Sequence, residues 1–140
     1  MELSSEIIVE NPQVAVLNVS GRVDGSNYLA LVEKARELFV GGTGYLILNL
    51  EGCNYLSSAG FFALHNIALI SNKLAPLNQD NGWSAFRNMA NEKRDFKDRF
   101  KIVNVPQNIM HSLEIAGLDS LYAIYPGRQD ALAAFRMVIH

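Results

Sequence analysis

The stretch from residue 45 to residue 70 limits the possible folds of this 140-residue chain more than any other part. Residues 45–50 (YLILNL) are apolar at almost every position, which is typical of a strand buried on both faces. Residues 61–70 (FFALHNIALI) are apolar nearly all round, which predicts a largely buried helix. Residues 55–60 (YLSSAG) join the two. A buried strand that leads into a buried helix favours an α/β layered fold.

A predicted hairpin and a predicted amphipathic helix precede this stretch. Residues 6–10 and 14–19 are β-leaning runs separated by the turn signal Asn-Pro, which predicts an antiparallel hairpin. Residues 28–39 carry apolar side chains at helical spacing, with charged side chains on the opposite face. We expect Ser26 to cap this helix and the glycines at 41–42 to end it.

Strands and helices continue to alternate in the second half of the chain. We expect a strand at 100–105, a helix that starts at Pro106 and stops at Gly117, and a short strand at 121–125. This order predicts an α/β fold with a mixed sheet. The apolar face of a terminal helix carries Leu132, Phe135, Val138 and Ile139.

The composition predicts a single domain with one core. No apolar run approaches the roughly 20 residues of a membrane span. A net charge of −2 argues against direct nucleic-acid binding, which needs a basic surplus. The lone cysteine, Cys53, fits a reducing compartment, and the first residues lack the features of a signal peptide. We therefore expect a cytoplasmic protein that contacts neither a membrane nor nucleic acid directly.

Residues 73–99 interrupt the alternation of strands and helices. A connection of this length is uncommon within a compact domain and is usually functional or disordered. It contains the only tryptophan, Trp83, and together with Lys101 it holds seven of the twelve basic residues. One interpretation is a solvated loop anchored by one aromatic side chain. The other is a docking element in which Trp83 and Phe86 meet an acidic or phosphorylated partner.

No catalytic or metal-binding constellation stands out in the sequence. The three histidines, His65, His111 and His140, are scattered, and none has metal-ligand spacing to a carboxylate or a cysteine. We expect His65 to be a satisfied core or interface residue and Cys53 to be a small buried apolar one. Ser58 lacks a Gly-x-Ser-x-Gly elbow and an evident His–Asp pair, so a hydrolase is a weak hypothesis. We expect no enzymatic activity, no cofactor and no metal.

The serine junction at 57–60 (SSAG) is the strongest candidate for a functional site. It places two hydroxyls at the start of a predicted helix, where backbone N–H groups lack partners. Such a position suits a capping oxygen and equally a phosphate group. Since capping and phosphorylation are compatible, both interpretations stay open for Ser57 and Ser58.

Several segments, taken in order, resemble the STAS domain of bacterial anti-anti-sigma factors. The resemblance implies a STAS fold, in which the mixed sheet opens with a β-hairpin and the helices lie mainly on one face. It covers the chain apart from 73–99, which resembles an insertion into a single domain spanning 1–140. The segments that carry it are 16–24 (VLNVSGRVD), 46–60 (LILNLEGCNYLSSAG), 103–107 (VNVPQ), 113–119 (LEIAGLD) and 131–135 (ALAAF).

The resemblance implies a regulatory switch. Anti-anti-sigma factors bind an anti-sigma factor that is also an ATP-dependent serine kinase, and they thereby free the sigma factor. The kinase phosphorylates a serine in the motif Asp-Ser-Ser/Thr-Gly, and a metal-dependent serine phosphatase removes the phosphate. We therefore expect an anti-sigma factor kinase and a serine phosphatase as partners, and a monomer or weak homodimer as the oligomeric state.

Laid on this sequence, the motif identifies the residues of the switch. Ser57 takes the position of the family's aspartate, Ser58 that of the phosphorylated serine, and Ala59 and Gly60 those of the next two residues. Asp24 matches the family's acidic residue after the second strand, in a loop expected to lie beside the serine junction. The neutral Ser57 departs from the usual acid. The expected partner-binding residues are Asp24, Asn54, Ser57, Ser58, Ala59 and Gly60.

An alternative hypothesis assumes the same fold but a function that does not depend on phosphorylation. In that hypothesis the chain is a phosphorylation-independent scaffold or sensor module, which binds a ligand or a protein partner through the 73–99 insertion.

Overall fold

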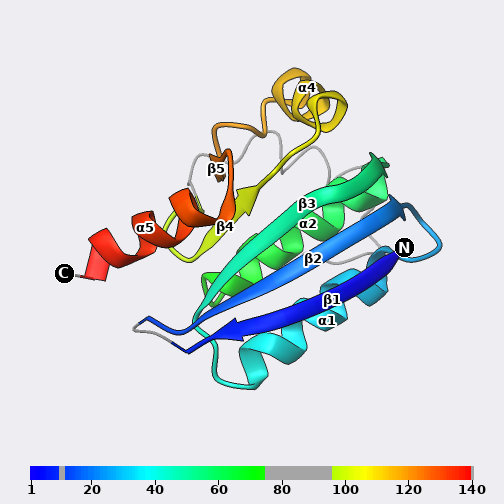
Figure 1. Ribbon diagram of the computed structural model, residues 1–140. Coiled ribbons are helices and arrows are strands. Elements are labelled where there is room, and N and C mark those ends of the chain that lie inside the picture. The colour runs from blue at the N-terminus through cyan, green and yellow to red at the C-terminus, as the bar shows by residue number, and fades with distance from the viewer. Residues whose placement is uncertain (10–11, 75–95, 140) are drawn as a thin grey trace.

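The computed structural model describes residues 1–9, 12–74 and 96–139. In these residues five strands form one sheet in the order β1-β2-β3-β4-β5. The opening strands, β1 (Glu2–Ile8) and β2 (Val14–Val23), pair antiparallel. All later pairings are parallel, through β3 (Tyr45–Leu56), β4 (Phe100–Val103) and β5 (Ala123–Tyr125). The mixed sheet with its opening hairpin is therefore confirmed, and Figure 1 shows the strands side by side.

The described helices lie mainly on one face of this sheet. Helices α1 (Tyr28–Val40) and α2 (Ser58–Ser71) run together behind β1, β2 and β3 in Figure 1. They share the larger apolar core with α4 (Gln107–Ala116), which supplies two buried side chains to it. The terminal helix α5 (Arg128–Ile139) packs in a separate, smaller core on the other face. The predicted STAS-like layering is confirmed.

The central strand β3 is buried on both faces over its first half, as its sequence predicts. Leu46, Leu48 and Leu50 point into the larger core, whereas Ile47 lies in the smaller one. The strand also continues six residues beyond Leu50, because its second half pairs with the end of β2 across two register shifts. The last residues of β2 and β3 therefore finish at the same edge of the sheet.

Some element boundaries differ from the prediction. Pro106 is the N-cap of α4 rather than its first residue, while Gly117 ends the helix in the left-handed region (φ 73°) as expected. The fifth strand is two residues shorter than predicted. In α5, Leu132 and Phe135 are buried as expected, and the side chains of Val138 and Ile139 lie outside the described residues.

The basic cluster predicted around 73–99 is only partly exposed. Trp83 and Phe86, like the rest of 75–95, lie outside the described residues. Lys101, by contrast, is 3% exposed on β4, where its Nζ donates to the carbonyl of Lys97 at 2.6 Å. Arg99 is half-buried and donates to the carbonyl of Gly44 at 3.3 Å. Both side chains donate to backbone carbonyls beside the sheet and do not belong to an exposed docking surface.

None of the helices in the described ranges combines the length and the apolar character needed to cross a lipid bilayer.

The leucines of β3 that face the larger core are fully buried, so truncating one of them leaves a cavity. Leu48 is fully buried, so Leu48→Ala is expected to lower the free energy of unfolding by about 2–5 kcal/mol. The control Ile115→Ala removes an apolar side chain that is 75% exposed on α4, and it should change the free energy by no more than about 0.5 kcal/mol. Urea unfolding followed by circular dichroism measures both. Similar losses in the two variants would contradict this assignment of the core.

Candidate functional site

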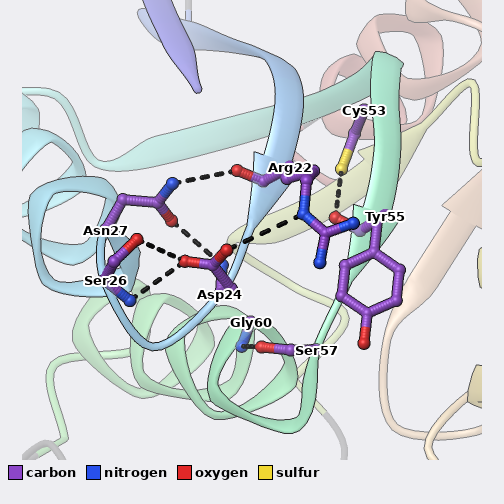
Figure 2. A network of polar contacts seen from close by, with 8 residues as sticks. All are labelled: Arg22, Asp24, Ser26, Asn27, Cys53, Tyr55, Ser57 and Gly60. Atoms are coloured by element: carbon purple, nitrogen blue, oxygen red, sulfur yellow. Dashed lines mark hydrogen bonds and ion pairs between the residues drawn. The ribbon is translucent and has the colours of Figure 1, made fainter.

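The candidate site lies where β2 and β3 end. Asp24 follows the last residue of β2, and Ser57 follows the last residue of β3. The backbone N–H of Ser57 donates to the carbonyl of Val23 at 3.0 Å, so the two loops are tied together. Figure 2 shows the Asp24 loop directly above the first turn of α2. The expected proximity of Asp24 to the serine junction is therefore observed.

The two serines of the junction have different structural roles. Ser57 is the N-cap of α2, with extended backbone angles, and its Oγ accepts a hydrogen bond from the N–H of Gly60 at 3.3 Å. Ser58 is the first helical residue, and its side chain is exposed. In the described part of the chain no hydrogen bond to the Ser58 hydroxyl is found. Because Ser57 already caps the helix, the Ser58 hydroxyl is not needed as a cap and is accessible at the surface.

Gly60 allows the first turn of α2 to approach the sheet closely. A Cβ at this position would lie 2.6 Å from Cδ1 of Leu56 and 3.3 Å from the carbonyl oxygen of Val23. Both neighbours are buried, so neither can move away easily. A side chain here would push the helix start, and with it Ser58, away from the end of β2.

Asp24 organises its own loop through hydrogen bonds. Its Oδ1 accepts from the Ser26 hydroxyl at 2.5 Å and from the Ser26 N–H at 3.0 Å. These hydrogen bonds, that of the hydroxyl first, lower the pKa of the Asp24 carboxyl below its ordinary value. Asn27 closes the loop from the other side, since it accepts from the N–H of Asp24 and donates to the carbonyl of Arg22, each at 3.0 Å.

The prediction that Ser26 caps α1 is wrong. The N-cap residue of α1 is Asn27, whose side chain makes no capping bond. Ser26 instead uses its hydroxyl to hold Asp24, because an aspartate two residues earlier accepts from the Ser26 N–H in the same turn. The serine before α1, which resembles a helix cap in the sequence, therefore belongs to an Asx turn formed by Asp24.

Two residues of this edge were missed by the sequence analysis. The guanidinium carbon of Arg22 lies 4.2 Å from the centre of the Tyr55 ring, and Arg22 Nε lies 3.8 Å from Asp24 Oδ2. Figure 2 shows Arg22 between Asp24 and Tyr55. The signal that could have found the pair is the parallel register of β2 and β3, which places Arg22 opposite Tyr55.

Asn54 lies on the α4 side of the same edge. It is exposed, and its carbonyl accepts a hydrogen bond from the Asn108 side chain of α4 at 3.4 Å. The structure thus brings Ser57 and Gly60 into contact with each other and with the Val23 carbonyl, directly before Asp24 in the chain. Ser58 follows Ser57 at the same edge, and Asn54 extends this edge toward α4.

The remaining polar candidates are structural. His65 is buried in α2, with Nδ1 2.7 Å from the Tyr122 hydroxyl, which confirms its place in the core. Cys53 is buried as expected, and burial raises the pKa of its thiol. Across the described ranges, no group of three or more His, Cys, Asp or Glu side chains is arranged to bind a metal ion.

Residues 7–73, which include the whole candidate site, match the family model of the STAS domain. The chain contains a STAS domain. No curated protein sequence matches it.

Solved structures share the fold of this STAS-domain protein over almost the whole chain. An anti-sigma factor antagonist from Mycobacterium paratuberculosis has 21% identity and a TM-score of 0.64, with 96% of this chain and 95% of that one covered. RsbS from Moorella thermoacetica, as a serine-to-glutamate variant, has 13% identity and a TM-score of 0.67, with 99% and 98% covered. Phosphorylated SpoIIAA from Bacillus has 14% identity and a TM-score of 0.55, with 95% and 98% covered. At these identities the likeness establishes the fold.

The tight packing at Gly60 gives a test of the site's architecture in this STAS domain. Replacing a glycine inside a helix by alanine ordinarily stabilises a protein by about 0.5–1 kcal/mol. Gly60→Ala should instead destabilise it by about 1–3 kcal/mol in urea unfolding, because the new Cβ is overpacked. The control Gly25→Ala adds a Cβ with no heavy atom within 4 Å and should be well tolerated. A Gly60→Ala variant as stable as the parent would contradict the close approach.

The hydrogen bonds from Ser26 predict how the pKa of the Asp24 carboxyl changes when one of them is removed. Removing the hydroxyl in Ser26→Ala should raise the pKa of the Asp24 carboxyl toward its ordinary value of 3.8, as followed by carbon-detected NMR titration. Because the folded-state pKa lies below the unfolded value, Asp24 stabilises the fold above the unfolded pKa. This contribution is lost as the pH falls through the folded pKa. Ser112→Ala on α4 serves as the control, and an unchanged Asp24 pKa in Ser26→Ala would rule out this account of the loop.

Proposed function

We propose that this STAS domain is an anti-sigma factor antagonist that is switched by phosphorylation of Ser58. In the dephosphorylated state it binds an anti-sigma factor that is also a serine kinase, and so frees a sigma factor. The binding surface comprises Asp24, Asn54 and the junction 57–60, together with the start of α2. The observation that carries the proposal is the exposed Ser58 hydroxyl at a helix start that Ser57 already caps.

The switch consists of two group-transfer reactions. The kinase transfers the γ-phosphoryl group of ATP to Ser58 Oγ: the bond from Pγ to its bridging oxygen breaks, the O–P bond forms, and ADP leaves. The hydroxyl proton passes to a base of the kinase. A serine phosphatase later adds water across the O–P bond, which restores the serine hydroxyl and releases inorganic phosphate.

The position of Ser58 suits a phosphate that changes the surface and leaves the fold intact. A phosphoserine carries about −1.5 to −2 charges at pH 7, and the first turn of a helix favours negative charge. The first turn of α2 contains no acidic residue that would repel it. The phosphate would, however, have to lose its water against a bound partner, and each 1.4 kcal/mol lost weakens binding about tenfold.

The comparisons support this proposal. One structure with the same fold is a phosphorylated protein, and another carries glutamate in place of a serine. We further propose that residues 1–140 form one STAS domain in which 73–99 is an insertion, and that the protein acts in the cytoplasm, where sigma factors are found.

Phosphorylation of Ser58 can be tested by intact mass spectrometry after incubation with ATP and lysate from the native host. The parent protein should gain one phosphate, and Ser58→Ala should gain none. The control Ser57→Ala loses the helix cap, at a cost of about 1 kcal/mol, but it keeps the Ser58 hydroxyl and should still be phosphorylated. With the kinase in hand, calorimetry should show that Ser58→Ala binds like the parent and that Ser58→Glu binds at least tenfold more weakly.

Two results would count against the switch. One is a phosphate gain that persists in Ser58→Ala, which would place the modified residue elsewhere. The other is equal affinity of Ser58→Ala and Ser58→Glu for the partner, which would favour the phosphorylation-independent scaffold and its 73–99 insertion.

A further inference from the structure

Arg22 occupies an unusual position in the polar network of the candidate site (Figure 2). Its side chain is 61% exposed, yet it is held by two neighbours: the Tyr55 ring and the Asp24 carboxylate. It lies opposite Tyr55 in the β2–β3 register, near the ends of both strands. The proposed function uses Asp24 but leaves this cation without a role.

Both contacts of Arg22 can be exchanged at little cost. The ion pair with Asp24 is exposed and long, at 3.8 Å, and exposed pairs of this kind contribute little to stability. Asp24 does not depend on it, because Ser26 supplies two hydrogen bonds to the other carboxylate oxygen. Tyr55 is 41% exposed as a residue, so the guanidinium over its ring does not bury it.

Arg22 and the phosphoacceptor lie at the same edge of the sheet. Neighbouring strands are about 4.8 Å apart, and Arg22 is one strand from Tyr55, three residues before Ser58. The next residue, Val23, accepts the N–H of Ser57 at 3.0 Å. Arg22 Nε lies 3.8 Å from Asp24 Oδ2, and Asp24 follows the last residue of β2 at the edge where α2 begins.

We propose that Arg22 binds the phosphate on Ser58 and thereby transmits the modification to Asp24 and Tyr55. This inference rests on the proposed function of Ser58. A guanidinium forms bidentate hydrogen bonds with a phosphate, and these charge-assisted bonds are stronger than its present contacts. When Arg22 turns to the phosphate, the Asp24 carboxylate loses its counter-charge and one face of the Tyr55 ring is uncovered.

The consequence is that one phosphate changes the partner surface at three residues. The phosphate alters Ser58 itself, and the departure of Arg22 alters Asp24 and Tyr55. A glutamate at position 58 reproduces only part of this effect, because a single carboxylate attracts the guanidinium less strongly than a phosphate with nearly two charges. Arg22 is therefore a positioning residue of the switch.

The test places phosphoserine at position 58 during synthesis, through an expanded genetic code, so that no kinase is needed. The second pKa of the phosphate, ordinarily near 6, is then measured by ³¹P NMR titration. Arg22 should lower it, so Arg22→Gln should raise it by about 0.5 unit or more. The control Arg36→Gln removes an equal charge from an exposed side chain of α1. Arg36 lies roughly 12 Å along α1 from the first residue of that helix, so this variant should leave the phosphate pKa unchanged.

A second readout follows the Tyr55 ring. Its NMR resonances should shift on phosphorylation in the parent protein and shift much less in Arg22→Gln, where no guanidinium covers the ring. If Arg22→Gln and Arg36→Gln gave the same phosphate pKa, Arg22 would not be the phosphate ligand. Because the phosphate is installed without a kinase, such a failure is distinct from a failure to find Ser58 phosphorylated by the host lysate.

Discussion

The whole candidate site depends on the contact between the end of β2 and the first turn of α2. The Val23 carbonyl accepts the Ser57 N–H at 3.0 Å, and Gly60 packs against the same oxygen with no room for a side chain. This contact sets the position of the helix start relative to the Asp24 loop. Without it, Ser58 and Asp24 would belong to two loops joined only through the sheet. With it, both residues belong to one rigid surface.

The rigidity of that surface comes from the core beneath it. Helix α2 is buried along nearly its whole length, so its first turn cannot move without disturbing the larger apolar cluster. The capping bond of Ser57 fixes the same turn from the solvent side. A phosphate added to Ser58 therefore meets a preformed helix terminus. The switch that we propose here would therefore act through charge and solvation and leave the backbone unchanged.

Much of the fold could be predicted because it follows from local patterns. The apolar run in β3, the apolar character of α2 and the glycine that ends α4 each carry their own signal, and all three appear as predicted. The junction sequence also predicts serine hydroxyls at the helix start. Only the position of the Gly60 N–H shows that Ser57 is the capping residue and that Ser58 is not. These features depend on neighbours within a few residues.

What could not be predicted depends on contacts between distant segments. Lys101 counts as a surface charge by composition, yet it is buried between β4 and α5, with Nζ 4.5 Å from the centre of the Phe135 ring. Ser26 has the sequence position of a helix cap and instead serves Asp24. The Arg22–Tyr55 contact joins residues 33 positions apart and arises only from the register of two parallel strands. Periodicity and turn signals carry no information about such pairs.

The charge balance at the site explains how Ser57, at the position where the resembling family motif carries an acid, fits the proposed switch. One anion, Asp24, and one cation, Arg22, face each other there, so their charges cancel before modification. A phosphate on Ser58 adds nearly two negative charges, which Arg22 can neutralise only in part. An aspartate at position 57 would add a further negative charge beside the phosphate and compete for the same guanidinium. The neutral Ser57 caps the helix equally well, and in the proposed switch it would leave Arg22 to respond to the phosphate alone.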